Sequence, residues 1–292
     1  MKKSVKLAVT ASLGLLVSAA SWAGPVILGG DDLTDHGSRS AGGANLEGWL
    51  YIEKAISSLF GTQTRPGALT VDIVALGSVN PGAGVYTSSN AGGAINSVAN
   101  VLGRSLSFYD GATNIGTFFS DLASGAVNPG VIWIAGTGAS NNLVATEGAA
   151  LTANANAINS FVGSGGGLMA HGSGPVAYGW LTALLPGLTE VSGCNSSGAT
   201  LTAAGSAAFP GLSNSDIDAN AGPCHSHFEG NFGGLTTLAL DGSNPARSYI
   251  IGAAAGGGGS ITDPPSGVPE PATLLLVGVG LAGLASRRKH AL

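Results

Sequence analysis

Short apolar runs recur along the chain, and each is followed by a segment in which apolar positions have helical spacing. The runs do not alternate with polar residues, which favours strands buried on both faces. Because these runs alternate with helical segments, the pattern predicts right-handed crossovers and a parallel sheet. The five predicted strands span residues 26–28, 71–76, 106–109, 131–135 and 167–170, and the helices that follow the first four span 46–60, 94–102, 115–123 and 147–162.

Beyond Gly172 the pattern loosens. One more helix is predicted over residues 176–185, and the segment 200–222 is polar and rich in turn residues. Residues 235–240 and 248–251 flank a turn sequence and predict an antiparallel hairpin at the sheet edge. The predicted fold class is therefore α/β: a three-layer, doubly wound, mostly parallel sheet of flavodoxin-like type with a C-terminal antiparallel hairpin.

The two ends of the chain have the composition of targeting segments. A basic start, an apolar run and the sequence Ser21-Trp22-Ala23 predict a signal peptide over residues 1–23, cut by signal peptidase. At the other end, the stretch Ala272–Ala285 has no charge and Arg287, Arg288 and Lys289 follow it. A helix of this length spans roughly 21 Å, so it crosses a membrane only with its flanks and some bilayer thinning. We expect a C-terminal hydrophobic anchor helix whose basic end stays cytoplasmic.

The sequence Val268-Pro269-Glu270-Pro271, the short apolar span and the terminal Arg287-Arg288 resemble the PEP-CTERM sorting signal of Gram-negative bacteria. The resemblance implies recognition and cleavage by an exosortase, and delivery to the cell surface or the extracellular polysaccharide. An ordinary tail anchor is the alternative. The predicted organisation is a signal peptide (1–23), an exported domain (24–255), a Gly/Pro linker (256–267) and a sorting signal with a short transmembrane helix (268–292).

Charge is scarce in the predicted domain. Of the 11 basic residues in the chain, six lie in the two targeting ends, and charged residues make up 9% of the whole. The five basic residues that remain cannot neutralise a run of phosphates, which argues against nucleic acid as a partner.

A second resemblance covers most of residues 25–251. The Gly-Gly-Asp-Asp after the first strand, the segment Gly165–His171 and Ala208–Leu212 resemble the class I glutamine amidotransferase-like superfamily, in particular its ThuA-like branch. Members that hydrolyse glutamine carry a nucleophilic Cys at the turn after the fifth strand. Here the turn reads Ala170-His171-Gly172-Ser173-Gly174, so glutamine hydrolysis by that mechanism is not supported.

Polar residues follow the predicted strands, at the sheet edge where ligands of parallel α/β folds bind. The ligand-binding candidates are Asp31, Asp32, His36, Asp110 and His171. We expect Asp31, His36 and His171 to surround one cleft, because loops of neighbouring strands share an edge.

Three readings of these residues stay open. A divalent metal such as zinc would suit His171, His225 and His227 with nearby carboxylates. Asp31, His171 and Ser173 are the catalytic candidates for hydrolysis, although Ser173 lacks the Gly-x-Ser-x-Gly register. The third reading is structural: aspartates in Gly-Gly-Asp-Asp favour turns, and the histidines make ordinary polar contacts.

Cys194 and Cys224 are the two cysteines of the chain. In an exported protein we expect them to form a disulfide, and Cys224 as a metal ligand is the alternative. Two functional classes follow from the sequence. The first is a non-catalytic surface or matrix protein that binds a sugar, polysaccharide or protein, and the second is an exported hydrolase or metal-dependent enzyme.

Overall fold

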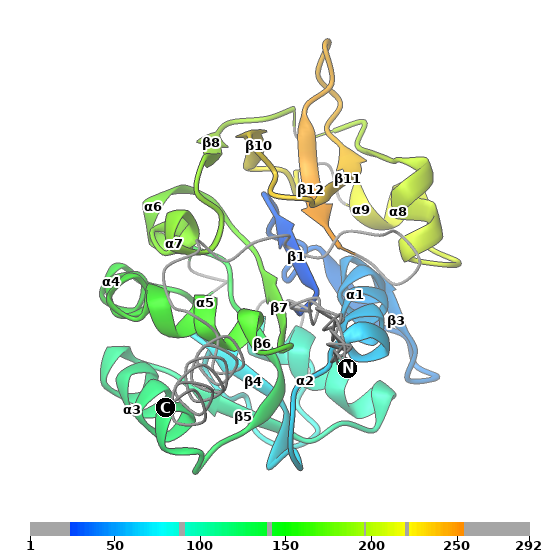
Figure 1. Cartoon of the computed structure of the whole chain (residues 1–292). Helices are drawn as coiled ribbons and strands as arrows, with labels where there is room; N and C mark the ends of the chain where they lie inside the picture. Colours follow the sequence, from blue (N-terminus) through cyan, green and yellow to red (C-terminus); the bar gives the residue numbers. More distant parts are fainter. Residues whose placement is uncertain (1–23, 88–90, 139–141, 196, 220–221, 254–292) are drawn as a thin grey trace, which may run out of the picture.

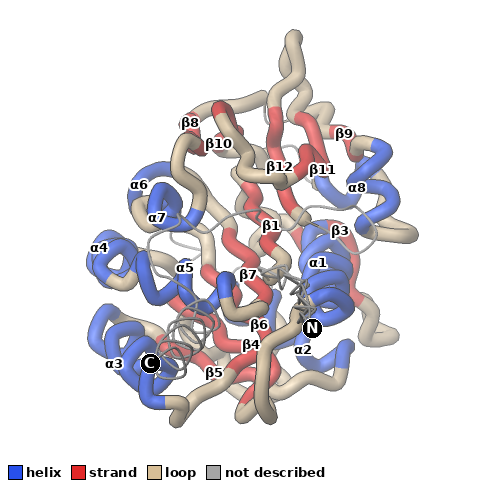
Figure 2. Tube along the Cα trace, in the orientation of Figure 1, coloured by secondary structure: helices blue, strands red, loops and turns tan. Residues whose placement is uncertain are grey.

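The computed structural model describes residues 24–87, 91–138, 142–195, 197–219 and 222–253. Five parallel strands form one half of a large sheet, and Figure 2 shows them running through the middle of the molecule. Their spatial order is β5 (Leu106–Tyr109), β4 (Val71–Leu76), β6 (Pro129–Ile134), β7 (Gly167–Ala170) and β1 (Val26–Gly29). All five coincide closely with the apolar runs of the sequence.

Helices cover both sides of this parallel half (Figure 1). Helices α1 (Gly48–Thr62) and α2 (Ala91–Leu102) pack together on one side. On the other side lie α3 (Ala112–Ser124), α4 (Ala145–Ala153) and α5 (Ala155–Gly163). This division follows from the connections. The chain moves in one direction along the sheet from β1 through β4 to β5 and then returns, and right-handed crossovers place the helices of opposite directions on opposite faces.

The second half of the sheet is antiparallel. Strand β12 (Ser248–Gly252) pairs with β1 and, farther along, with β10 (Ser226–Gly230), which pairs with β8 (Leu188–Ser192). The hairpin partner of β12 is β11 (Thr236–Leu240), which also pairs with β9 (Thr200–Leu201). The predicted C-terminal hairpin is therefore present, but it does not lie at the sheet edge, because β12 pairs with β1 and β10 as well as with β11.

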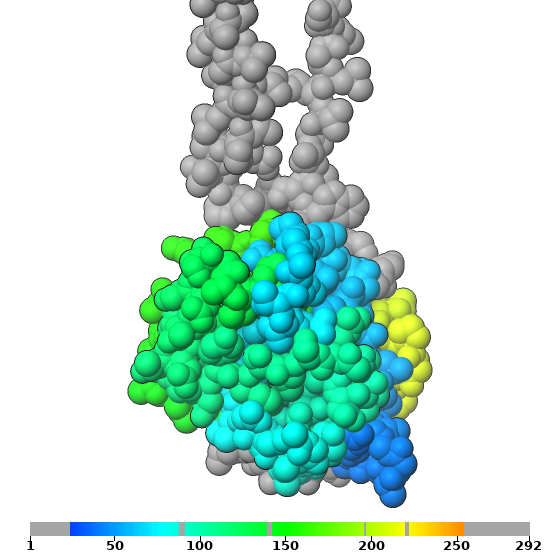
Figure 3. Space-filling model, turned by 90° about the horizontal axis from the view of Figure 1, so that it is seen from below, coloured from blue at the N-terminus to red at the C-terminus, as the bar shows by residue number. Residues whose placement is uncertain are grey.

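Short elements fill the connections. The β2–β3 hairpin, coloured blue, projects from the surface seen in Figure 3. These elements are β2 (Gly37–Arg39), β3 (Asn45–Glu47), α6 (Gly174–Tyr178), α7 (Leu181–Leu184), α8 (Ala203–Ala208) and α9 (Asn214–Ile217).

The core lies where the strands meet the helices. Strands β1, β6 and β7 are buried along their whole length, as the runs without alternation require. Trp49 of α1 and Phe118 of α3 are fully buried, so each helix layer contributes large side chains to the core. At about 25 cal/mol per Å² of apolar surface, each such aromatic side chain contributes several kcal/mol of burial free energy.

The strand order corrects one expectation. A flavodoxin-like sheet places the first strand between the second and third strands of the chain. Here β1 lies beyond β7, at the border with the antiparallel half, while β4 and β6 pair directly. The apolar runs are alike in length and composition, so they predict the strands but not which strands become neighbours.

Two further expectations concern helices. The helix predicted over 147–162 is two helices, because Asn154 leaves helical geometry between α4 and α5 and its side chain donates to the Ala150 carbonyl. Within the part of the chain that the structure describes, no helix has the length and apolar character needed to cross a membrane. The predicted signal peptide, the sorting signal and its anchor helix lie outside the described residues.

Candidate functional site

Asp31 and His171 lie together at the carboxyl edge of the sheet. Strands β1 and β7 are parallel neighbours, with Leu28 opposite Ala170, so the residues that follow them meet. The Nδ1 atom of His171 is 2.7 Å from Oδ1 of Asp31. Both side chains are 0% exposed. The sequence therefore placed the two residues at one point, but the point is enclosed in the core and is not an open cleft.

The hydrogen bonds of His171 determine which of its ring nitrogens carries the proton. The indole Nε1 of Trp133 donates to Nε2 of His171 over 3.0 Å. Because an indole N–H can only donate, Nε2 must accept, and the imidazole proton is on Nδ1, where it is donated to Asp31. Both ring nitrogens are thus engaged. His171 has no free lone pair for a metal ion and none for activating a nucleophile.

Glycine is required where the chain approaches this pair. A Cβ atom on Gly29 would lie 1.6 Å from Oδ2 of Asp31, and one on Gly30 would lie 2.0 Å from the Ser226 carbonyl oxygen. The Gly-Gly before Asp31 therefore serves close packing in the core. The functional reading of Gly-Gly-Asp-Asp as a ligand loop is not needed to explain these glycines.

Two tyrosines complete the surroundings of Asp31. The hydroxyls of Tyr51 and Tyr249 and the Oδ2 atom of Asp31 are buried without hydrogen-bond partners among the described residues. Burial, and then the negative charge of Asp31, raise the pKa of both tyrosines well above the ordinary value. The two phenols stay protonated at neutral pH and remain possible donors inside the core.

Ser173 precedes α6 and is half-buried. Its carbonyl oxygen accepts a hydrogen bond from the Thr137 hydroxyl. The nearest histidine in sequence, His171, is already committed to Trp133 and Asp31. The Ser–His arrangement considered for hydrolysis therefore has no free imidazole at this turn.

Asp110 lies apart from the other candidates. It follows β5, which is separated from β7 by β4 and β6, so about three strand spacings of ~4.8 Å lie between Asp110 and His171. Its neighbour is Glu147, a residue that the sequence did not single out. Glu147 accepts hydrogen bonds from the backbone N–H groups of Gly111 and Val144. Burial, partly opposed by these hydrogen bonds, raises the pKa of Glu147, and the nearby Asp110 raises it further.

The turn after β1 carries a second cluster, made of Asp32, Asp35, His36 and His225. His225 Nε2 is 2.7 Å from Asp32 Oδ2, and His36 Nε2 is 3.3 Å from Asp32 Oδ1. The contact with Asp32 raises the pKa of both histidines, more than burial lowers it. Burial raises the pKa of Asp35, and the charge of Asp32 raises it further. His36 therefore contacts Asp32 and does not reach the Asp31–His171 pair, which corrects the expectation of one shared cleft. Asp35 is a member of this cluster that the sequence did not predict.

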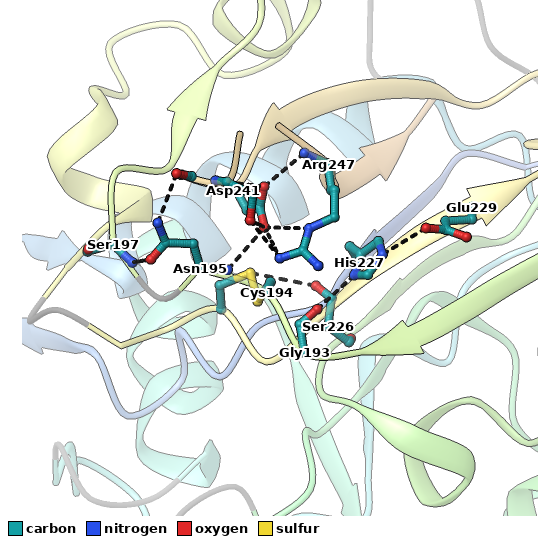
Figure 4. Close-up of polar contacts among 12 residues, drawn as sticks. Gly193, Cys194, Asn195, Ser197, Ser226, His227, Glu229, Asp241 and Arg247 are labelled. Carbon is teal, nitrogen blue, oxygen red and sulfur yellow. Dashed lines mark hydrogen bonds and ion pairs between the residues drawn. A yellow bond between two sulfur atoms is a disulfide. The ribbon is translucent and has the colours of Figure 1, made fainter. Parts of the chain in front are cut away.

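The predicted histidine set does not converge. His227 Nδ1 is 2.8 Å from the Gly193 carbonyl oxygen and its Nε2 is 3.0 Å from Glu229 Oε1. Figure 4 draws both contacts. His171 is enclosed with Asp31, and His225 contacts Asp32. The three side chains have separate partners, which corrects the expectation that His171, His225 and His227 share one metal ion.

The expected disulfide is present. Cys194 and Cys224 are joined across a sequence separation of 30 residues. Beside it, Asp241 is enclosed by donors (Figure 4). Its carboxylate accepts from the backbone N–H of Asn195, from Ser243 and from Arg247. Cys224 is bonded to sulfur and is unavailable as a metal ligand in this state.

Comparisons with known proteins add one finding. No curated protein and no solved structure matches the chain, so nothing among them supports the amidotransferase-like resemblance of the body. The PEP-CTERM protein-sorting motif matches residues 267–289. This is the segment in which Pro269, Glu270, Pro271, Arg287 and Arg288 were singled out. The chain therefore carries the sorting motif of exosortase substrates, which marks it as an exported protein of the surface or extracellular space of Gram-negative bacteria.

Proposed function

We propose that this chain is an exosortase-sorted surface or extracellular-matrix protein whose α/β domain is a non-catalytic binding domain associated with exopolysaccharide. The observation that carries the proposal is the sorting motif at residues 267–289. The resemblance to exosortase substrates implies delivery to the cell surface or to the extracellular polysaccharide. A glycan is therefore the ligand that its surroundings supply.

The chemistry at the carboxyl edge supports binding over catalysis. General acid–base work needs a group that reaches the substrate directly or through one water. Asp31 and His171 are 0% exposed, and both nitrogens of His171 are occupied. Their interactions stabilise the junction of β1 and β7 and offer no proton acceptor to a ligand outside.

A surface pocket supplies a place for a sugar. It has a volume of about 350 Å³ and lies between α3 and α5, next to the loop before β4. Its walls combine apolar side chains such as Phe119 and Leu122 with the polar groups of Ser160, Ser164 and Arg65. Sugar rings present both apolar faces and hydroxyl groups, so a wall of this mixed kind suits them.

Arg65 is held in place at this pocket. Its Nε donates to Asn128 Oδ1 over 2.8 Å and its Nη1 donates to the Ser164 hydroxyl. The guanidinium carbon lies 5.0 Å from the centre of the Phe161 ring. A fixed guanidinium loses little conformational entropy when it donates to sugar hydroxyls or carboxylates.

The chain offers a matched control. Arg104 also lies over an aromatic ring, 4.2 Å from the centre of Phe60, and borders a smaller pocket of about 250 Å³. We expect the exported protein to co-sediment with exopolysaccharide from the producing strain. Arg65→Ala should weaken this binding at least tenfold, whereas Arg104→Ala should leave it within twofold. Absence of binding, equal loss in both variants, or release of shortened glycan by the wild type would refute the proposal.

A further inference from the structure

The turn after β1 gathers metal-ligating groups at the carboxyl edge of the sheet. Asp32, Asp35 and His36 each offer one ligand atom, and these atoms all lie within 4.8 Å of one another. The turn is closed by the Asp35 N–H, which donates to the Asp32 carbonyl oxygen over 3.0 Å. The backbone therefore holds the three side chains on one side of a short loop.

Buried polar atoms in this cluster lack partners. Oδ1 of Asp32, Oδ1 of Asp35 and Nδ1 of His36 are buried, and none has a hydrogen-bond partner among the described residues. Asp32 Oδ1 and His36 Nε2 lie 3.3 Å apart as an ion pair, and Asp32 Oδ1 has no hydrogen bond beside it. Unpaired buried polar atoms are costly, and two carboxylates side by side also repel. One cation bound between them would remove both penalties.

His225 reaches the cluster from a distant part of the chain. Its Nε2 lies 2.7 Å from Asp32 Oδ2, the oxygen of that carboxylate that does not face His36. Its segment is fixed by the His225 N–H bond to Gly30, by the Asp32 N–H bond to Pro223 and by the disulfide at Cys224. The His225 side chain is 47% exposed and those of Asp32 and His36 are partly exposed, so the cluster lies near the surface.

We propose that Asp32, Asp35 and His36 form a site for a divalent cation of the zinc class, with His225 orienting Asp32. Two carboxylate oxygens and an imidazole nitrogen are a ligand set that zinc accepts, and three protein ligands leave a fourth position open to solvent. Carboxylates that bind a metal are themselves oriented by hydrogen bonds, and the contact of His225 with Oδ2 of Asp32 would serve this purpose. The site is separate from the proposed glycan pocket, so either proposal can fail alone.

The test is a titration of the exported full chain, treated with a chelator and dialysed, with Zn²⁺ and with Co²⁺. We expect one ion per chain by calorimetry and a visible absorption band when Co²⁺ binds. Asp35→Asn and His36→Gln should each weaken binding at least tenfold, and His225→Gln should weaken it less. The control is His227→Gln, because both nitrogens of His227 contact Gly193 and Glu229 away from the cluster. That variant should bind as the wild type does.

Several outcomes would overturn the proposal. The wild-type titration alone does so if it shows no saturable binding of one ion, whatever the variants do. Unchanged affinity in folded Asp35→Asn, or loss of binding in His227→Gln, would place the ion elsewhere. Tighter binding of Ca²⁺ than of Zn²⁺ would exclude an imidazole ligand, because Ca²⁺ prefers oxygen ligands. Unfolding free energies measured without metal show whether each variant is folded.

Discussion

Replacing Asp241 by Asn should destabilise the protein, and the loss of stability should narrow strongly in acid. Asp241 directly follows β11, and its side chain is fully buried. Oδ2 accepts from Asn195 N, Ser243 Oγ, and Arg247 Nε and Nη2 over 2.7–3.1 Å. Oδ1 accepts from the backbone N–H groups of Ser243 and Arg247. Because every one of these neighbours donates, an amide NH₂ in place of either oxygen would face donors.

The pKa gives the size of the effect. Burial alone would raise the pKa of Asp241, but the hydrogen bonds from Arg247, Ser243 and Asn195 lower it from 3.8 to about 2. At about 1.4 kcal/mol for each tenfold change in acidity, the folded protein gains roughly 2–2.5 kcal/mol from the charged carboxylate. Since the pKa is lowered on folding, this contribution is complete well above pH 4 and is lost as the pH falls toward 2.

The assay is urea unfolding of wild type and Asp241→Asn, without reductant, at pH 7 and near pH 2.5. We expect the variant to unfold with a free energy lower by about 2–3 kcal/mol at pH 7, and the difference to narrow strongly in acid. Asp72→Asn is the matched control. Asp72 also accepts from a serine and an arginine, Ser105 and Arg104, but both ionic partners are partly exposed. Its loss should stay below about 1 kcal/mol. Equal losses in the two variants, or a difference for Asp241→Asn that does not depend on pH, would refute the reasoning.

Three further predictions concern the core and the chain ends. Replacing Cys194 and Cys224 by Ser should lower the unfolding free energy by roughly 3–4 kcal/mol, because the disulfide closes a loop of about 30 residues and restricts the unfolded chain. Free thiols in peptide maps made without reductant would contradict this pairing. Trp133→Phe removes the donor to His171 Nε2 and should lower the free energy of urea unfolding by about 1–3 kcal/mol. Trp180→Phe is the control and should lower it less, because the Trp180 indole donates to a carbonyl three residues away in sequence. Mass spectrometry should find Gly24 at the mature N-terminus and the segment after Pro-Glu-Pro removed, with a longer membrane-bound form when the host exosortase is deleted; one mass in both strains would count against exosortase processing.

Local patterns predicted the strands well, and they predicted the sheet order poorly. The run Val131–Ile134 favours a buried strand, because its apolar residues are continuous, the run is short and turn residues lie close on either side. The strand that pairs with β1 depends on how many strand positions the crossover after α1 passes over, and local sequence patterns do not determine that number. The antiparallel half was hardest to predict. β8 and β10 mix polar residues with apolar ones and contain no continuous apolar run, so their sequences resemble loops.

The split of the predicted helix at Asn154 has a local cause that the sequence contains. The side chain of Asn can hydrogen-bond to nearby backbone groups and so competes with the hydrogen bonds of a helix. Here the Asn154 side chain donates to the Ala150 carbonyl oxygen. Glu147 could also have been found. It lies three residues after Val144, the residue before α4, and its carboxylate accepts the backbone N–H of Val144. This contact is one half of a capping box.

At the candidate site, the sequence predicts which residues meet better than it predicts whether they are exposed to solvent. Asp31 and His171 could be placed together because both directly follow strands, and parallel neighbours align their carboxyl ends. Their enclosure depends on Trp133, Tyr51 and Tyr249, which come from three other elements and meet them only in the folded core. One residue farther from the strand, the same turn leaves the core: Asp32 is partly exposed and contacts His225 and His36. Adjacent aspartates in one Gly-Gly-Asp-Asp sequence therefore have opposite roles. The first stabilises the junction of two strands, and the second is partly exposed and contacts two histidines.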